Sequence, residues 1–334
     1  MKQLIIFLVS MLSWIFLHAQ NVQWTWISGD STGNNIDVYG NMRVPDSINK
    51  PGSISPLNTW TDRAGNFYMF GGSTLAIRFD FDTIPVFSNA LWKYSPVKNA
   101  WAMITGSNSS IYAMSGGGGV FGTPGVPAPD NTPERLEVGG ATWTDTSGNW
   151  WMFGGRTGYR SAGTKSQLWK FDPVIGQWTY LRGDGDESPP SYGTKGIPAL
   201  SNTPGARVGM KSWTDREGNL YLYGGFGGYG SSTAFYGDVW KYDQATNLWV
   251  WVSGRQRHWG ISDKPVYGTK EVFTDDNTPG AFPVNIFFIG VADSNSIISM
   301  HIDSELWRYS MKTNQWAWVS GDRTINPYPN PKHN

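Results

Sequence analysis

The sequence predicts an all-β chain of about four repeated four-stranded units, and three observations carry this prediction. A sixteen-residue phrase with a strand–turn–strand pattern occurs four times in the 334 residues. A second phrase ending in Gly-Gly precedes three of the copies, and a third phrase containing a Tyr-Gly or Phe-Gly pair lies upstream of each copy. Self-similarity at such a period indicates a modular architecture in which each unit buries its faces against its neighbours.

The sixteen-residue phrase predicts two strands joined by a tight turn. Its copies read "LWKYSPVKNAWAMITG", "LWKFDPVIGQWTYLRG", "VWKYDQATNLWVWVSG" and "LWRYSMKTNQWAWVSG". The first tryptophan recurs after 77, 71 and 67 residues, and a second tryptophan follows it by nine residues in every copy. These repeated tryptophans are Trp92 and Trp101, Trp169 and Trp178, Trp240 and Trp249, and Trp307 and Trp316.

The third unit illustrates the four predicted strands. Strand one precedes the turn at residues 215–219, in which Asp favours the turn start and Gly adopts a left-handed conformation without steric cost. Strand two is Leu220–Tyr223, which Gly224 and Gly225 terminate. Strand three is Val239–Tyr242, and strand four is Leu248–Val252.

Both faces of the predicted sheets are apolar. Side chains alternate along a strand, so Trp249 and Trp251 point to one face, while Val250 and Val252 point to the other. A sheet that is apolar on both faces must be covered on both. We therefore expect the sheets to stack, with Trp92, Trp169, Trp240 and Trp307 in the core.

The recurring phrases resemble the kelch repeat of β-propellers. The resemblance rests on the Gly-Gly pair after strand two, the Tyr or Phe on strand three and the second tryptophan of strand four. The pairs are Gly71-Gly72, Gly154-Gly155 and Gly224-Gly225. It implies a kelch-type β-propeller over residues 20–321 with about four four-stranded blades, and a fifth, incomplete blade is the alternative. The repeated units of this chain are longer than kelch units, which have about 50 residues. The additional residues form an insert between strand four of one unit and strand one of the next.

Two departures bear on the number of blades. From Pro279 to Asn285 is only 6 residues, against 15 for the corresponding stretch from Pro204 to Asn219. We therefore expect the fourth unit to lack about one strand and to use "NIFFIG" as its strand two. Conversely, "NVQWTWISG" from Asn21 is a lone copy of strand four before any unit begins.

The N-terminus predicts export. Lys2 is followed by the apolar run Leu4–Leu17 and by Ala19, as in a secretory signal peptide covering residues 1–19. The run is short for a membrane span, although an uncleaved anchor is the alternative. We expect a secreted, periplasmic or cell-surface protein with no membrane span after signal removal and a polar C-terminal tail at residues 322–334. The chain has no Cys and hence no disulfide, and its 26 Lys and Arg balance 26 Asp and Glu, so no nucleic-acid partner is indicated.

The loops at one end of the sheets are the predicted binding surface. Turns one–two and three–four are short and similar in every unit, whereas loops two–three and four–one, at the opposite end, differ in every unit. Binding residues generally lie on such loops over a rigid frame. We expect residues 156–160, 226–230 and 255–260 to converge around one mouth, and the turns at Asp145 and Asp215 to play no part in binding. The candidate ligand-binding residues are Arg78, Arg156, Tyr159, Arg160, Arg182, Phe226, Tyr229 and Trp259; the alternative is that they only cover the sheets.

Signals for catalysis are weak. His258, His301 and His333 have no metal-ligand spacing, and we expect no metal, no cofactor and no catalytic residue. Some kelch propellers are copper-radical oxidases that need a Tyr–Cys cross-link, which a chain without Cys cannot form. The predicted function is a non-catalytic module that binds a glycan or a protein at one propeller face; the alternative is a carbohydrate-active propeller enzyme. Arg135 and Arg207 match an Arg often seen in kelch repeats, and we expect them to brace neighbouring loops.

Overall fold

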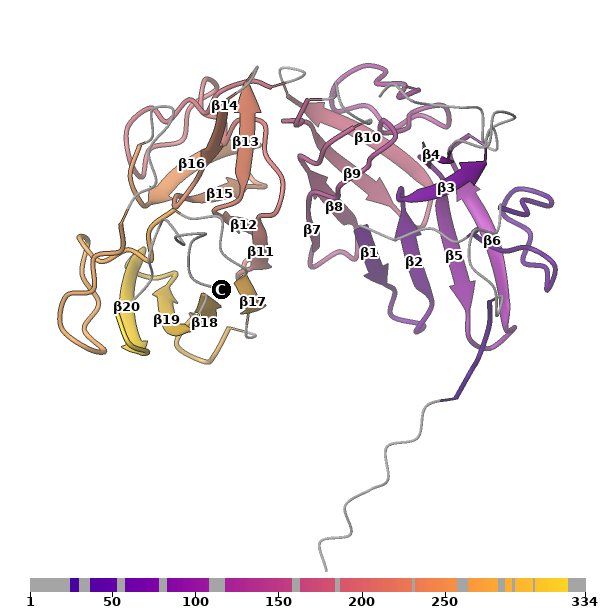
Figure 1. The fold of residues 1–334 in the computed structure, drawn as a ribbon. Coiled ribbons are helices and arrows are strands. Elements are labelled where there is room, and N and C mark those ends of the chain that lie inside the picture. Colours follow the sequence, from indigo (N-terminus) through magenta and orange to yellow (C-terminus); the bar gives the residue numbers. More distant parts are fainter. Residues whose placement is uncertain are drawn as a thin grey trace, which may run out of the picture.

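The described part of the chain forms four four-stranded antiparallel sheets, or blades, and two small hairpins (Figure 1). The computed structural model describes residues 25–29, 37–52, 58–77, 83–107, 118–157, 163–183, 187–229, 232–256, 264–281, 286–289, 292–302 and 304–323. The predicted all-β fold of about four four-stranded blades is confirmed within these residues. None of the described segments forms an apolar helix of membrane-spanning length.

Each blade pairs its strands in chain order. The first blade contains β1 (Asn58–Thr61), β2 (Phe67–Phe70), β5 (Leu91–Ser95) and β6 (Ala100–Thr105). The second contains β7 (Ala141–Thr144), β8 (Trp150–Phe153), β9 (Leu168–Asp172) and β10 (Gln177–Arg182). The third contains β11 (Lys211–Thr214), β12 (Leu220–Tyr223), β15 (Val239–Asp243) and β16 (Leu248–Ser253). The fourth contains β17 (Ile286–Ile289), β18 (Ile297–Ile302), β19 (Glu305–Ser310) and β20 (Gln315–Ser320).

The blades follow one another in an open arc. The inner strand β1 lies beside β7, β7 beside β11, and β11 beside β17, whereas β17 makes no comparable contact with β1 in the described part of the chain. Figure 1 shows the first and fourth blades at the two ends of this arc. We call the side of a blade that packs on the next blade its leading face, and the other side its trailing face.

The interfaces between blades are the hydrophobic core. Trp249 and Trp251 on the trailing face of the third blade lie in one cluster with Trp143 and Phe153 of the second. On the leading face, Val250 and Val252 lie in a cluster with Trp307 and Trp316 of the fourth. The predicted alternation of bulky and aliphatic side chains is therefore confirmed. Indole N–H groups of strand one also link neighbouring blades. Trp60 Nε1 donates to the carbonyl oxygen of Trp143 at 3.2 Å, and Trp143 Nε1 donates to that of Tyr221 at 2.8 Å.

The tryptophans of strand three are buried, as predicted. Their exposed fraction is 0–1%, and each packs against the aromatic residue of an insert at a ring-centroid distance of 5.3–5.5 Å. The pairs are Tyr39 with Trp92, Phe121 with Trp169, Tyr192 with Trp240, and Tyr267 with Trp307.

Each insert is a hairpin-like loop that covers the outer strand of the blade that follows it in sequence. In the third insert, Ser191 and Thr203 exchange backbone hydrogen bonds. Asn202 Nδ2 donates to the carbonyl oxygens of Ile197, at 2.9 Å, and of Trp249 in β16, at 3.0 Å. An exposed strand edge invites pairing with other chains, and this cover protects it. Asn49, Asn131 and Asn277 make the equivalent two bonds in the other inserts.

The asparagine clamp gives a prediction about stability. Asn202→Ala is expected to lower the free energy of unfolding by about 1–3 kcal/mol, because two carbonyl oxygens lose their donor in a buried place. Gly193→Ala should also destabilise, since Gly193 has φ +58° and an added Cβ would lie 2.3 Å from Asn202 Oδ1. Chemical denaturation measures both. Leu200→Ala in the same insert, at an 82% exposed side chain, is the control and should have no effect beyond about 0.5 kcal/mol.

The turns one–two are held by an aspartate. Asp62 Oδ1 accepts from the backbone N–H groups of Ala64 and Asn66, and Oδ2 accepts from Asn66 Nδ2 and the Tyr68 hydroxyl. Burial disfavours the charge, but these hydrogen bonds outweigh it, and the pKa of Asp62 is held below its usual value. Asp145 and Asp215 accept equivalent bonds.

The expectation that the fourth unit lacks about one strand and uses "NIFFIG" as its strand two was wrong. The segment "NIFFIG" contains β17, which is strand one, and strand two is β18. Between them Asp293 forms the same turn, with Oδ1 accepting from the N–H groups of Asn295 and Ile297. Ser296, at φ +63°, stands where the other turns have Gly. The shortening is instead at loop two–three, where only residues 303 and 304 separate β18 from β19.

The ends of the chain are only partly described. Residues 25–29, from the lone copy of strand four, form no strand and are exposed. The predicted signal peptide and most of the predicted tail lie outside the described residues, so both stay predictions.

Candidate binding site

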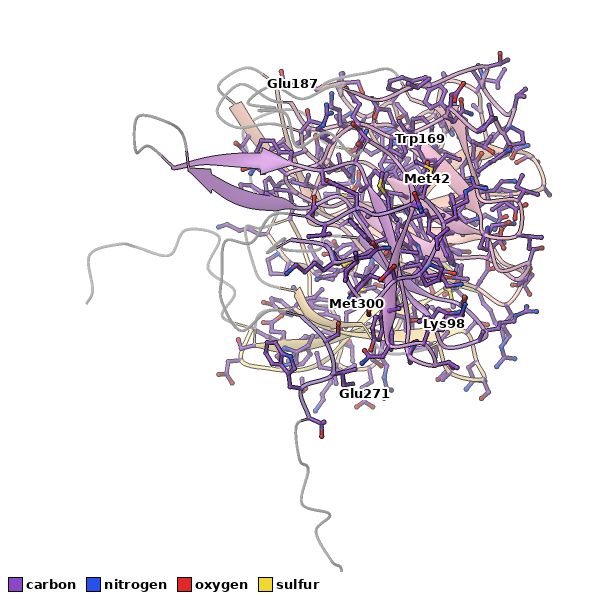
Figure 2. The ribbon with its side chains drawn as sticks, turned by 90° about the vertical axis from the view of Figure 1, so that its right-hand side faces the viewer. Met42, Lys98, Trp169, Glu187, Glu271 and Met300 are labelled. Atoms are coloured by element: carbon purple, nitrogen blue, oxygen red, sulfur yellow. The ribbon has the colours of Figure 1, made fainter. Side chains whose placement is uncertain are left out.

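Loops two–three of the first and third blades are extended into hairpins at the same end of the sheets. The first hairpin is formed by β3 (Ser73–Ile77) and β4 (Thr83–Phe87), and the second by β13 (Phe226–Tyr229) and β14 (Ser232–Phe235). Figure 2 shows the β3–β4 hairpin projecting away from the sheets. Within the described chain, neither β3 nor β4 pairs with any other strand.

Arg156 begins loop two–three of the second blade and is half-buried. Its backbone forms bridges with Val138 and Thr164. Its Nε lies 3.2 Å from Glu137 Oε2, with exposed side-chain fractions of 36% and 25%. Arg156 is therefore at the predicted end of the sheets, in an ion pair that water still reaches.

Phe226 hydrogen-bonds to the short segment of residues 206–208, which also contacts the start of the loop that carries Arg156. Val208 exchanges two backbone hydrogen bonds with Phe226, while the neighbouring Arg207 accepts from Gly155 N–H and donates its own N–H to Lys165. Phe226 and Gly155, the residue before Arg156, thus both hydrogen-bond to residues 207–208. The Phe226 ring packs against Phe235 with a centroid distance of 6.0 Å.

Arg182 lies on the outer rim, away from these loops. Its guanidinium donates to the carbonyl oxygens of Leu200, at 2.6 Å, and of Asn247, at 3.2 Å. These bonds join β10 to the third insert and to the three–four turn of the next blade. The structure does not bring Arg182 together with Arg156 and Phe226.

The remaining candidate residues have no described side chain. Arg78, Tyr159, Arg160 and Trp259 lie outside the described residues, and only the backbone of Tyr229 is described. Of residues 255–260, the structure describes only 255 and 256. Whether the three segments meet at one mouth stays a prediction.

A buried ion pair lies beneath the loops of the third blade. Arg207 Nη1 is 2.7 Å from Asp238 Oδ1, and both side chains are at most 1% exposed. The guanidinium also donates to the carbonyl oxygens of Gly224 and Pro204 and lies 4.0 Å from the centroid of the Tyr236 ring. Burial alone would lower the pKa of Arg207, but the attraction of Asp238 outweighs it and the pKa is raised. The predicted bracing role of Arg207 is confirmed.

A second buried charge cluster lies in the second blade and was not predicted. Lys165 Nζ is 3.0 Å from Glu134 Oε2, and the Lys165 side chain is 3% exposed. Gln167 Nε2 donates to the same carboxylate oxygen at 3.1 Å. Gln167 occupies the position of Asp238 in the third blade, two residues before the strand-three tryptophan. Comparison of the units at this position is the signal that could have drawn attention to the cluster.

A cavity of about 690 Å³ lies beside β1 and β2 of the first blade and β7 of the second, and was also missed. The sequence patterns indicated only the loops as a binding surface, and none of them pointed to this cavity. The residues that line the cavity come from both blades: Thr59, Trp60, Thr61, Phe67, Tyr68, Met69 and Trp101 from the first, and Thr142, Trp143 and Thr144 from the second.

Within the described residues, no group of three His, Asp or Glu side chains is arranged to hold a metal ion. The described charged side chains beneath the loops are instead engaged with one another. The arrangement can hold a ligand by shape, aromatic contact and hydrogen bonding.

Comparison with known proteins assigns no family to the chain. No family model and no curated protein matches the chain. Among the solved structures that resemble it is one titled "Structure of YjhT", with 12% sequence identity over 88% of this chain and 69% of that chain, and a TM-score of 0.42. The description of the fold therefore rests on the sheets themselves.

Proposed function

We propose that the chain is a non-catalytic binding module that acts outside the cytoplasm and recognises a glycan or a protein with the loops at one end of its blades. The observation that supports this most is the contrast between the two ends. At one end, the aspartate turns repeat with the same hydrogen bonds. At the other end, two of the loops two–three contain hairpins of different sequence, β3–β4 and β13–β14.

The burial of the charges near these loops supports binding rather than catalysis. Arg207 and Lys165 are buried and each faces a carboxylate. General acid–base catalysis needs a titratable group within hydrogen-bond reach of a substrate, and a group sealed in a buried ion pair does not provide this. Their role in the proposal is to hold the loops rigid.

The projecting hairpins favour a polypeptide as the ligand. An exposed strand edge offers a row of backbone N–H and C=O groups that an extended peptide can pair with. The β3–β4 hairpin has this form, since its strands pair only with each other in the described chain.

The test screens the mature protein against a phage-displayed peptide library and a glycan array. We expect peptide ligands whose affinity falls at least tenfold when residues 74–86 are replaced by the tight turn Asn-Gly. Alanine variants of Tyr159, Arg160 and Tyr229 should lose affinity together. Val174→Ala, at a 91% exposed side chain in a three–four turn, is the matched control and should bind normally.

Two results would contradict parts of the proposal. Ligands found only on the glycan array would leave a binding module but would contradict the polypeptide as its ligand. If Val174→Ala lost binding while the hairpin variant still bound, the binding site would lie at the opposite end of the blades, among the short turns.

A further inference from the structure

Part of the trailing face of the first blade remains exposed. Phe67 of β2 lies opposite Thr61 of β1 and Tyr94 of β5, and Tyr94 in turn lies opposite Trp101 of β6. Opposite residues of antiparallel strands point to the same face. Phe67 is 53% exposed and Trp101 is partly buried. At the same two positions, the other blades have residues that are only 0–1% exposed: Trp150 and Trp178, Leu220 and Trp249, and Ile298 and Trp316.

The insert before the first blade covers the rest of this face. Tyr39 stacks on Trp92 with a ring-centroid distance of 5.5 Å, and the backbone N–H of Asp46 donates to the carbonyl oxygen of Trp101. Trp92 and Met103 are at most 2% exposed. What stays open is therefore a limited site over the inner strands and not a whole sheet face.

A row of three aromatic rings borders this open site. The Phe67 ring lies 6.5 Å from the Tyr94 ring with an angle of 29° between their planes, and the Tyr94 ring lies 5.1 Å from the Trp101 ring. Phe67 and Trp101 both line the cavity of about 690 Å³. This volume is within the range of about 300–1,000 Å³ that is usual for small-molecule sites.

Threonine hydroxyls line the same cavity. Thr59 and Thr61 of β1 are exposed and share the face of Phe67, and Thr142 and Thr144 of β7 also line the cavity. In the part of the chain that the structure describes, none of these four hydroxyls has a hydrogen-bond partner. Each can both donate and accept a hydrogen bond. None of the described residues that line the cavity carries a charge.

This lining determines the kind of ligand. A charged group enclosed here would lose hydration without gaining an opposite charge, which favours an uncharged ligand. A purely apolar ligand would cover the threonine hydroxyls without giving them a partner. A neutral sugar avoids both costs, because its ring has an apolar C–H face that packs on aromatic rings and hydroxyl groups that exchange hydrogen bonds with threonine.

We propose that the cavity beside β1 and β2 binds a neutral sugar, whose ring packs on Phe67 and Trp101 and whose hydroxyl groups hydrogen-bond to Thr59 and Thr61. Thr61 and Phe67 flank the one–two turn of the first blade. The loops two–three, at which we place the polypeptide ligand, lie at the opposite end of the blade. The sugar site is therefore a second site, independent of the function proposed above.

The experiment titrates the mature protein with the methyl glycosides of glucose, galactose and mannose. Each is compared with the methyl glycoside of the matching uronic acid, which differs by a carboxylate. Binding is detected by saturation-transfer NMR and quantified by calorimetry. We expect at least one neutral glycoside to bind at least tenfold more tightly than its uronic acid.

Four variants locate the site, and circular dichroism confirms that each is folded. Phe67→Leu keeps an apolar side chain but removes the ring, so the affinity should fall about tenfold, whereas Phe67→Tyr should bind normally. Thr61→Val removes one hydroxyl at nearly constant shape and should weaken binding about two- to tenfold. Trp26→Leu, at a 69% exposed ring outside the cavity, is the matched control and should bind normally.

Three results would overturn the sugar site. None of the neutral glycosides binds, or the uronic acids bind equally well. Phe67→Leu and Thr61→Val both keep the full affinity, which would put the sugar elsewhere. Phe67→Leu loses no more affinity than Trp26→Leu, which would make the effect unspecific.

The variant with residues 74–86 replaced by Asn-Gly separates this site from the polypeptide site. It should keep the sugar affinity, and loss of sugar binding in this variant would move the sugar to the loops and refute the inference. If no peptide bound to the protein while the sugar binding still depended on Phe67, the proposed polypeptide ligand would be refuted and the sugar site would stand.

Discussion

Replacement of Arg207 by methionine is expected to lower the free energy of unfolding by about 3–5 kcal/mol, as for other buried ion pairs that lose one partner. Methionine fills much of the same volume, so the loss comes mainly from Asp238, which remains buried without its cation. The Gly224 carbonyl oxygen loses a donor in the same step. Denaturation followed by circular dichroism measures the change.

Two further variants separate the charge from the packing. Arg207→Met combined with Asp238→Asn should recover most of the lost stability, because the amide oxygen can still accept from Tyr192 and Trp240 without carrying a charge. Arg156→Met, at the half-exposed pair with Glu137, should cost no more than about 1 kcal/mol. Equal losses in Arg207→Met and Arg156→Met would mean that Arg207 is not the buried brace described here.

The strands could be predicted because their signals are local. Side-chain alternation, the Asp and Gly of the turns and the repeated tryptophans are each visible within a few residues, and they place β12, β15 and β16 within one residue of their observed ends. The same local signals gave a wrong assignment for the fourth blade. Ser296 takes the left-handed conformation that the other turns give to Gly, so the turn at Asp293 was not recognised and strand one was mistaken for strand two.

The contacts between distant segments could not be predicted. Asn202 reaches Trp249, 47 residues away, and nothing in a single unit indicates that an insert folds back on the outer strand. The exposure of Phe67 depends on which blade lies beside it, and its own sequence environment is the same as that of buried Leu220. The candidate site was predicted only in part. Phe226 and the residue before Arg156 both hydrogen-bond to residues 207–208, whereas Arg182, chosen on the same grounds, contacts the outer rim.

Trp240→Ala is expected to cost about 3–5 kcal/mol, the usual range for removing a large buried aromatic side chain. The residue is 0% exposed, packs on Tyr192 with a centroid distance of 5.3 Å, and donates from Nε1 to Asp238 Oδ2 at 2.9 Å. Trp240→Phe keeps a buried six-membered ring but removes the donor together with part of the indole, so it should cost less than Trp240→Ala and more than the about 0.5–1.5 kcal/mol of the hydrogen bond alone.

Trp92 is the matched comparison for Trp240. It occupies the same position in the first blade and is equally buried, but its indole N–H has no hydrogen-bond partner in the described chain, and Phe67 on the same side of its blade is 53% exposed. We therefore expect Trp92→Ala to cost less than Trp240→Ala, and Trp92→Phe to cost less than Trp240→Phe, because both Phe variants lose part of the ring but only Trp240→Phe also loses a hydrogen bond. Denaturation of the four variants measures this. If Trp240→Ala were as stable as Arg156→Ala, the assignment of a repeated core and a variable loop surface would be wrong. If Trp92→Phe and Trp240→Phe lost the same stability, the bond to Asp238 would contribute nothing, and the pattern that distinguishes the third blade from the first would be packing alone.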